Sequence, residues 1–129
     1  MRIGLPTTLA LAFLGVTGLQ ASAEDLKATI SAPKSDRPLY IEFKLENKSA
    51  VTQNPKINQS KLLLNGKELP ESSMIFGNGP RDQRFTALPA GQSLNFSHDL
   101  RVYVRQPGRY QLVWKGENYS SNSLSVDRK

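Results

Sequence analysis

Apolar and polar residues alternate along most of the chain after residue 25. The pattern is clear where Leu26, Ala28 and Ile30 alternate with polar neighbours, and it returns over residues 39–46. Successive side chains of a β-strand point to opposite faces, so this period of two predicts strands with one buried face. No segment of residues 24–129 shows a convincing helical period. The pattern therefore predicts an all-β domain.

The expected strands are short and separated by turn signals, which favours a sandwich of two antiparallel sheets. The pattern predicts seven or eight strands, drawn from residues 26–32, 39–46, 61–64, 67–69, 74–76, 84–88, 94–102, 110–115 and 124–126. The strand over 94–102 is long enough that a bend or bulge is expected within it.

Several turns can be assigned from their residues. Asn65-Gly66 is the preferred pair for a type I′ hairpin turn, because both central positions need a positive φ. Leu88-Pro89-Ala90-Gly91 predicts a β-turn with proline second and glycine fourth. The polar stretch 47–60 is expected to be a long loop, and long loops in compact domains are often binding elements.

The N-terminus has the arrangement of a signal peptide. Met1-Arg2 gives a positive start, an apolar run follows over residues 3–19, and the run ends at Ala21-Ser22-Ala23. The alternative is a membrane anchor, but Pro6 and several Gly and Thr residues interrupt the run. We expect cleavage after Ala23, an exported protein that is periplasmic or extracellular, and one mature domain over 24–129 without a transmembrane segment.

Composition limits the possible chemistry. The chain contains no cysteine, which excludes disulfides, thiol catalysis and thiolate metal sites. It has 17 Lys and Arg against 11 Asp and Glu, so residues 24–129, which lack Arg2, carry about +5. Such a charge favours acidic partners, although it also serves solubility. No nucleic-acid-binding function is expected.

The segment Gly108-Arg109-Tyr110-Gln111-Leu112 resembles the G-x-Y-x-C segment of immunoglobulin-type domains, with Leu112 at the cysteine position. With LPAGQSL before it and SNSLSV after it, the C-terminal part is similar to exported bacterial immunoglobulin-like modules. It is more distantly similar to macroglobulin-type domains and to the bacterial intracellular-proteinase-inhibitor family. The resemblance implies an immunoglobulin-like β-sandwich, and it says far less about function.

Ser97-His98-Asp99 contains the residue types of a catalytic triad. Consecutive strand residues point to opposite faces, so these three side chains should not converge. His98 is the only histidine, and we expect it to be partly buried and hydrogen-bonded rather than a metal ligand. The sequence therefore predicts a non-enzymatic protein with no metal and no cofactor.

Aromatic residues are a further class of candidate ligand contacts. Trp114 and Tyr110 alternate with polar residues in a central strand, so we expect both in the core. Tyr103 and Tyr119 lie near turns and are expected to be more exposed. Four N-x-S sequons are present, at Asn47, Asn58, Asn95 and Asn118, and chance is the preferred explanation for them.

The working hypothesis is a binding module for another protein, with inhibition of an extracytoplasmic hydrolase as one possible outcome. Its contact element would be residues 77–84, with Phe76 as an anchor and Asn78, Arg81 and Arg84 as polar contacts. The alternative is a binder of anionic polysaccharide or of the cell-envelope surface, through Tyr103 and Arg105 together with Arg101 and Arg109. A third possibility is a structural subunit of an envelope assembly.

Overall fold

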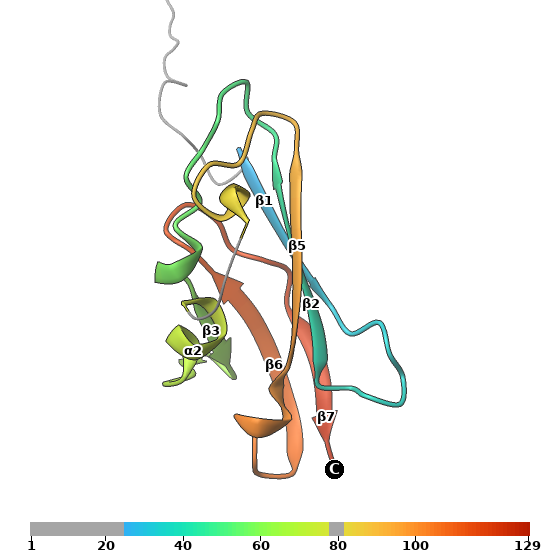
Figure 1. Cartoon of the computed structure of the whole chain (residues 1–129). Helices are drawn as coiled ribbons and strands as arrows, with labels where there is room; N and C mark the ends of the chain where they lie inside the picture. The colour runs from blue at the N-terminus through green and yellow to red at the C-terminus, as the bar shows by residue number, and fades with distance from the viewer. Residues whose placement is uncertain (1–24, 78–81) are drawn as a thin grey trace, which may run out of the picture.

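The computed structural model describes residues 25–77 and 82–129, and within them the chain forms two antiparallel sheets packed face to face (Figure 1). The first sheet has the order β1-β2-β5 and the second β4-β3-β6-β7. The strands are β1 (Leu26–Ser31), β2 (Tyr40–Asn47), β3 (Lys61–Leu64), β4 (Lys67–Glu68), β5 (Ser93–Asp99), β6 (Gly108–Lys115) and β7 (Leu124–Arg128).

The strand order is that of an immunoglobulin-like sandwich. The first, second and fifth strands share one sheet, and the third, sixth and seventh share the other, as in that fold. The short β4 pairs with β3 and so joins the second sheet. The predicted all-β sandwich is confirmed, with seven strands in the described part of the chain.

The core between the sheets is centred on aromatic rings. Phe43 of β2 stacks on Phe96 with ring centroids 5.0 Å apart, and it meets the edges of Phe76 and Trp114 at 5.4 Å. The prediction that Trp114 belongs to the core is confirmed, since its side chain has no exposed surface. Its indole Nε1 donates to Ser60 Oγ at 2.9 Å, which satisfies the one polar group of the ring.

The stretch 47–60 is a loop, and it is tied to the body by its buried ends. The amide of Asn47, which is 1% exposed, donates to the carbonyl oxygens of Val51 and Leu88 at 2.9 Å each. Further along, Ile57 begins the 3₁₀ helix η2 (Ile57–Gln59) and is buried in the core. These contacts tie both ends of the loop to the core.

The hairpin turn at Asn65-Gly66 is confirmed, with φ of 52° and 83° at the two residues. Asn65 Oδ1 also accepts a hydrogen bond from the backbone N–H of Gln111, which fixes the hairpin to β6. The second predicted turn lies one residue later than expected. Gln92 N–H donates to Pro89 O at 3.1 Å, which makes Gly91, with φ of 76°, the third residue of that turn.

Two predicted short strands are wrong. Residues 74–76 belong to a one-turn helix, α2 (Ser72–Phe76), and residues 83–85 form the 3₁₀ helix η3 (Gln83–Phe85). A strand would send Ile75 and Phe76 to opposite faces, whereas a helical turn lets both side chains reach the core. Burial of two adjacent apolar residues therefore outweighs the strand preference.

The long strand expected over 94–102 ends at Asp99. The next residues form the 3₁₀ helix η4 (Leu100–Val102), whose first N–H groups are capped because the Asp99 carboxylate accepts from Arg101 N–H at 3.1 Å. After η4 the chain turns into β6, where Tyr110 OH donates to Gln106 O at 2.7 Å. This bond is the corner that the immunoglobulin resemblance implies for that tyrosine.

Candidate functional site

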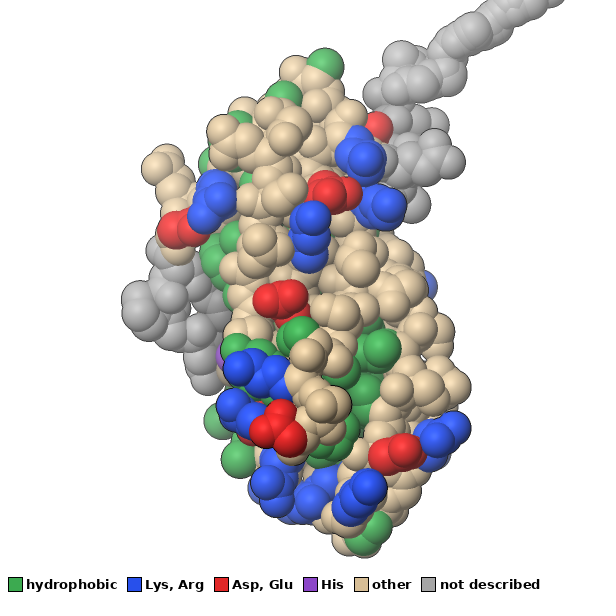
Figure 2. Space-filling view, turned by 90° about the vertical axis from the view of Figure 1, so that its right-hand side faces the viewer, with side chains coloured by type: hydrophobic (Ala, Val, Ile, Leu, Met, Phe, Trp, Pro, Cys, Tyr) green, Lys and Arg blue, Asp and Glu red, His purple; other side chains and the backbone are tan. Residues whose placement is uncertain are grey.

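The most basic part of the molecule is the end of the sandwich that contains η4 and the last residues of β7. Figure 2 shows Lys and Arg side chains gathered at this lower end, interspersed with a few carboxylates. We call it the basic end and define it by its seven cationic residues: Lys34, Arg37, Arg101, Arg105, Arg109, Arg128 and Lys129.

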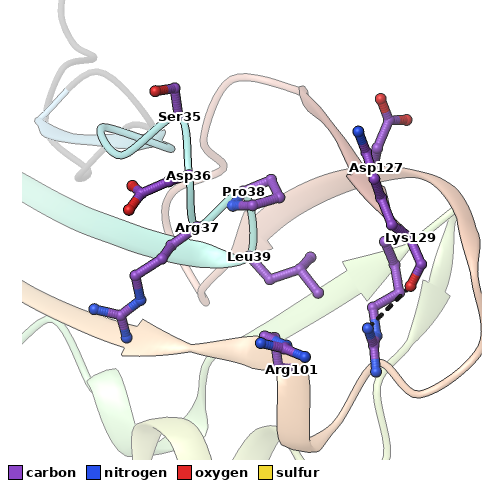
Figure 3. A pocket seen from close by; sticks show the side chains of 9 residues that line it. Ser35, Asp36, Arg37, Pro38, Leu39, Arg101, Asp127 and Lys129 are labelled. Carbon is purple, nitrogen blue, oxygen red and sulfur yellow. Dashed lines mark hydrogen bonds between the residues drawn. The ribbon is translucent and has the colours of Figure 1, made fainter.

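A cavity of about 400 Å³ opens at this end, between the loop that precedes β2 and the end of β7. Figure 3 shows Leu39 between Arg37 on one side and Asp127 and Lys129 on the other, with Arg101 beneath it. Leu39 is buried and forms an apolar floor. Around this floor, the four cations Arg37, Arg101, Arg128 and Lys129 outnumber the two carboxylates Asp36 and Asp127, so the rim is mainly cationic.

The loop over residues 33–39 is shaped by two consecutive turns. Arg37 N–H donates to Lys34 O, and Tyr40 N–H donates to Arg37 O, each at 3.0 Å. Both cations lie over the Tyr40 ring, with Lys34 Nζ at 5.2 Å and the Arg37 guanidinium carbon at 4.8 Å from its centroid. The tyrosine thus gathers two positive charges next to the cavity.

On the opposite rim, η4 is held by its own apolar residues. Leu100 and Val104 are buried, and Arg128 Nε donates to Val104 O at 2.9 Å. The side chains of Arg101 and Arg105, between and beyond these residues, are left on the surface. Tyr103 is half-buried and packs against the core. The buried side chains of Leu100 and Val104 thus fix the backbone of residues 100–105, and Arg101 and Arg105 extend from it into solvent.

Two of the cations at the basic end are held by carboxylates. Arg37 Nη2 lies 2.9 Å from Asp99 Oδ2, and Arg109 Nε lies 2.9 Å from Asp127 Oδ1. The hydrogen bond from Arg37 lowers the pKa of Asp99, and the one from Arg109 lowers the pKa of Asp127. Both carboxylates therefore stay ionised at neutral pH.

Arg101 and Arg105 differ from these two. Within residues 25–77 and 82–129, neither guanidinium lies within 4 Å of a carboxylate. The seven cations of the basic end outnumber the side-chain carboxylates of Asp36, Asp99 and Asp127, so a positive excess remains. An anionic group could pair with Arg101 and Arg105 without breaking an ion pair of the fold.

The structure corrects the prediction for Phe76. Its side chain has no exposed surface and its ring stacks on Trp114, with centroids 5.9 Å apart. It is a core residue and cannot anchor a partner while α2 is folded. Met74, which is 49% exposed, is the residue of α2 that faces solvent.

The other residues of the expected contact element give no assembled site. Asn78 and Arg81 lie outside the described residues. Arg84 is exposed, but its guanidinium donates to Asp82 Oδ2 at 2.8 Å and to the carbonyl oxygen of Ser93 at 3.0 Å. Its hydrogen-bonding groups are thus used to hold η3 against β5.

Of the second surface that the sequence suggested, Arg101 lines the cavity, whereas Tyr103, Arg105 and Arg109 are not among its lining residues and follow η4 in the chain. Sequence reasoning missed Arg37 and Arg128 as members of this end. A clue for Arg37 was available in the proline-flanked turn before a tyrosine, but nothing in the sequence placed that turn beside residue 101. The expectation that Tyr119 is exposed is wrong, because it is 3% exposed and burial raises the pKa of its hydroxyl.

No catalytic arrangement forms at Ser97-His98-Asp99. Ser97 Oγ lies 2.8 Å from Tyr40 OH and Asp99 pairs with Arg37, whereas the His98 ring is half-buried against Phe96 and Phe43. In the part of the chain that the structure describes, no three His, Asp or Glu side chains cluster as metal ligands would. Nor does a helix there have the length and apolarity needed to span a bilayer.

No protein-family model matches the chain, and no curated protein is significantly similar to it in sequence.

Proposed function

We propose that this protein is an exported, non-catalytic binding module whose basic end binds an anionic polymer of the cell envelope. The observation that carries the proposal is the pair Arg101 and Arg105: neither has a carboxylate partner among the described residues, and Arg101 lines the cationic cavity. Export is supported by the arrangement of residues 1–23.

The polymer is favoured over a single small ligand because the cations are spread around an open cavity. Arg37, Arg101 and Lys129 approach it from three different segments (Figure 3). Repeating carboxylate or phosphate groups could reach several of these cations at once, which adds their individually modest contributions. The hypothesis of a hydrolase inhibitor has less support, since its intended anchor, Phe76, is buried.

The test uses the mature chain, residues 24–129, and two carboxylated probes, polygalacturonate and poly-glutamate, with neutral dextran as the blank. Binding is measured by calorimetry at increasing salt. We expect both polyanions to bind and the affinity to fall steeply with salt, because pairs between exposed charges are screened. Dextran should not bind.

The site is tested with the double variant Arg101→Ala/Arg105→Ala. Its matched control is Lys67→Ala/Lys115→Ala, which removes the same charge from exposed residues of the second sheet. We expect the arginine variant to lose about tenfold or more in affinity and the lysine variant to lose much less. Equal losses would mean that only net charge matters and would overturn the assignment of the site.

A further inference from the structure

One edge of the first sheet carries backbone groups that point away from the sheet. In β1, Ile30 uses neither its N–H nor its C=O to pair with β2, because both bond to the side chain of Asn122. The Asn122 Oδ1 accepts from Ile30 N–H at 2.8 Å, and Nδ2 donates to Ile30 O at 3.0 Å. The amide thus imitates one residue of a neighbouring strand.

The backbone N–H and C=O of Leu26 and Ala28 also point away from β2, because the backbone groups of an antiparallel strand alternate between its two edges. Leu26 pairs with Asn47 and Ala28 with Leu45, at every second position of the register that pairs Ile30 with Phe43. Within the described residues, no group bonds to the outward N–H and C=O of Leu26 or Ala28. The outer edge of β1 therefore has unbonded backbone groups at Leu26 and Ala28, on the N-terminal side of Ile30.

A groove runs along that open edge. It has a volume of about 510 Å³ and lies between β1 and the loop that precedes β7, with Ala28, Thr29, Ser120 and Asn122 among its lining residues. Two lysines, Lys27 and Lys48, also line it. Glu46 lies 3.9 Å from Lys48 Nζ and opposite Lys27 in the register, but it is not a lining residue, and the two lysines outnumber it. The groove therefore combines unpaired backbone groups with a positive border.

The opposite edge of the sheet, on β5, has a charged side chain at one end. On β5, the carbonyl oxygen of Ser93 accepts a hydrogen bond from Arg84 Nη1 at 3.0 Å, which places a charged side chain against that edge. Natural sheets commonly protect exposed edges in this way. The outer edge of β1 is bonded to a neutral amide at Ile30 and has a groove beside Leu26 and Ala28, so it is the better placed of the two edges to receive another strand.

We propose that β1 accepts an extended, acidic segment of a partner protein as an added strand, with Asn122 marking the end of the binding groove. Strand addition takes its affinity from main-chain hydrogen bonds and its specificity from flanking side chains. Here Lys27 and Lys48 select acidic residues. Pairing with a second copy is disfavoured, because it would bring the same two lysines of both copies along one seam. This inference is independent of the proposed function at the basic end.

The probe is an immobilised library of capped hexapeptides in which Val or Thr alternates with Asp, Ser or Lys. We expect the mature protein to retain the Asp-containing members only. With the best member in solution, hydrogen exchange followed by NMR should show at least a tenfold slowing at the Ala28 amide. The amide of Thr29, which already pairs with β2, should change little.

Two variants test the geometry and the charge separately. Ala28→Pro removes an outward N–H without removing a hydrogen bond of the β1–β2 ladder, a position at which an edge strand accepts proline. Lys27→Gln/Lys48→Gln removes the positive border, and Lys67→Gln/Lys115→Gln is its control of equal charge. We expect Ala28→Pro to abolish peptide binding and the border variant to weaken it about tenfold.

Three outcomes would overturn the proposal. In the first, no peptide of the library is retained. In the second, the retained peptides slow exchange elsewhere and leave the Ala28 amide unchanged. In the third, the border variant and its control bind the peptides equally well. Since the lysine border variant changes only exposed side chains, it remains informative even if Ala28→Pro lowers stability.

Discussion

Helices α2 and η4 are single turns of similar length at different places in the sandwich, and the sequence suggests extended structure for both. The two turns differ in how much of their side chains is buried. In α2, Ile75 and Phe76 have no exposed surface and close the core. In η4, only Leu100 is buried, while Arg101 and Val102 face solvent.

The difference follows from what holds each turn. Ser72, at the start of α2, is buried; its hydroxyl donates to Leu69 O at 2.7 Å and accepts from Leu62 N–H at 3.0 Å. Asp99, before η4, bonds to an exposed arginine at the surface. The hydrogen bonds of Ser72 to buried groups hold α2 in the core. The ion pair of Asp99 lies at the surface, and the side chains of η4 after Leu100 face solvent. This contrast is why we propose a binding surface at η4 and not at α2.

The largest effect is expected for Phe76→Ala. Truncating a fully buried phenylalanine leaves a cavity among Phe43, Phe96 and Trp114, which should lower the free energy of unfolding by about 4 kcal/mol. Met74→Ala, on the exposed side of the same helix, should change it by less than about 0.5 kcal/mol. Urea unfolding followed by circular dichroism gives both values. Similar values for the two variants would mean that α2 is not part of the core.

Asn47→Ala should have the next largest effect. It removes a 1% exposed side chain that donates to Val51 O and Leu88 O and accepts twice from Ser49, so we expect a loss of about 2 kcal/mol in the same unfolding experiment. Asn58→Ala is the control, because Asn58 also begins an N-x-S sequence but is exposed. If the two variants were equally stable, the 47–60 loop would not depend on its buried asparagine.

A comparison of Arg84→Ala with Arg105→Ala separates an arginine that serves the fold from one that is available for binding. Arg84 bonds to Asp82 and to Ser93 O, so its loss should lower the thermal midpoint slightly and leave polygalacturonate affinity nearly unchanged. Arg105→Ala should weaken that affinity with no shift in the midpoint. Both variants remove one positive charge, so a reversed result would place the binding surface near η3.

The smallest effect is expected from pH. The hydrogen bond from Arg37 places the pKa of Asp99 below its unfolded value, so the pair stabilises the fold above about pH 4. This contribution is lost as the pH falls through the lowered pKa. Because a third of the carboxylate is exposed, the contribution should be less than about 0.5 kcal/mol.

Asp99→Asn checks this pH dependence. The difference in urea midpoint between the wild type and this variant should be largest near pH 7 and should shrink towards pH 3. A difference that grew on acidification would contradict the direction of the pKa shift.

The strands were predictable where one side of a segment is buried over several residues. The alternation of Leu26, Ala28 and Ile30 corresponds to buried positions of β1, and that of Ile41, Phe43 and Leu45 to buried positions of β2. The one-turn helices could not be recognised, because five residues do not complete two turns and give no helical period. Adjacent burial of Ile75 and Phe76 was the only signal against a strand.

The candidate site was less predictable, because its members are distant in sequence. Arg37 and Asp99 are 62 positions apart and meet only because β2 pairs with β5 in the register that joins Tyr40 to Asp99. The sequence indicated Arg101 and Arg105 as cations of one segment. Which arginines have partners depends on the three-dimensional pairing. The sequence predicts Arg84 as a contact residue, but its guanidinium bonds to Ser93 O and Asp82 within the fold.

Trp114 is the only tryptophan of the chain, and it is fully buried with its indole bonded to Ser60. Its fluorescence should therefore report on the centre of the sandwich alone, with emission at short wavelength in the folded protein. Ligands at the basic end or along β1 should leave that emission unchanged, while any opening of the core should shift it to longer wavelength. A single intrinsic probe can thus distinguish binding to an intact fold from binding that requires the fold to open.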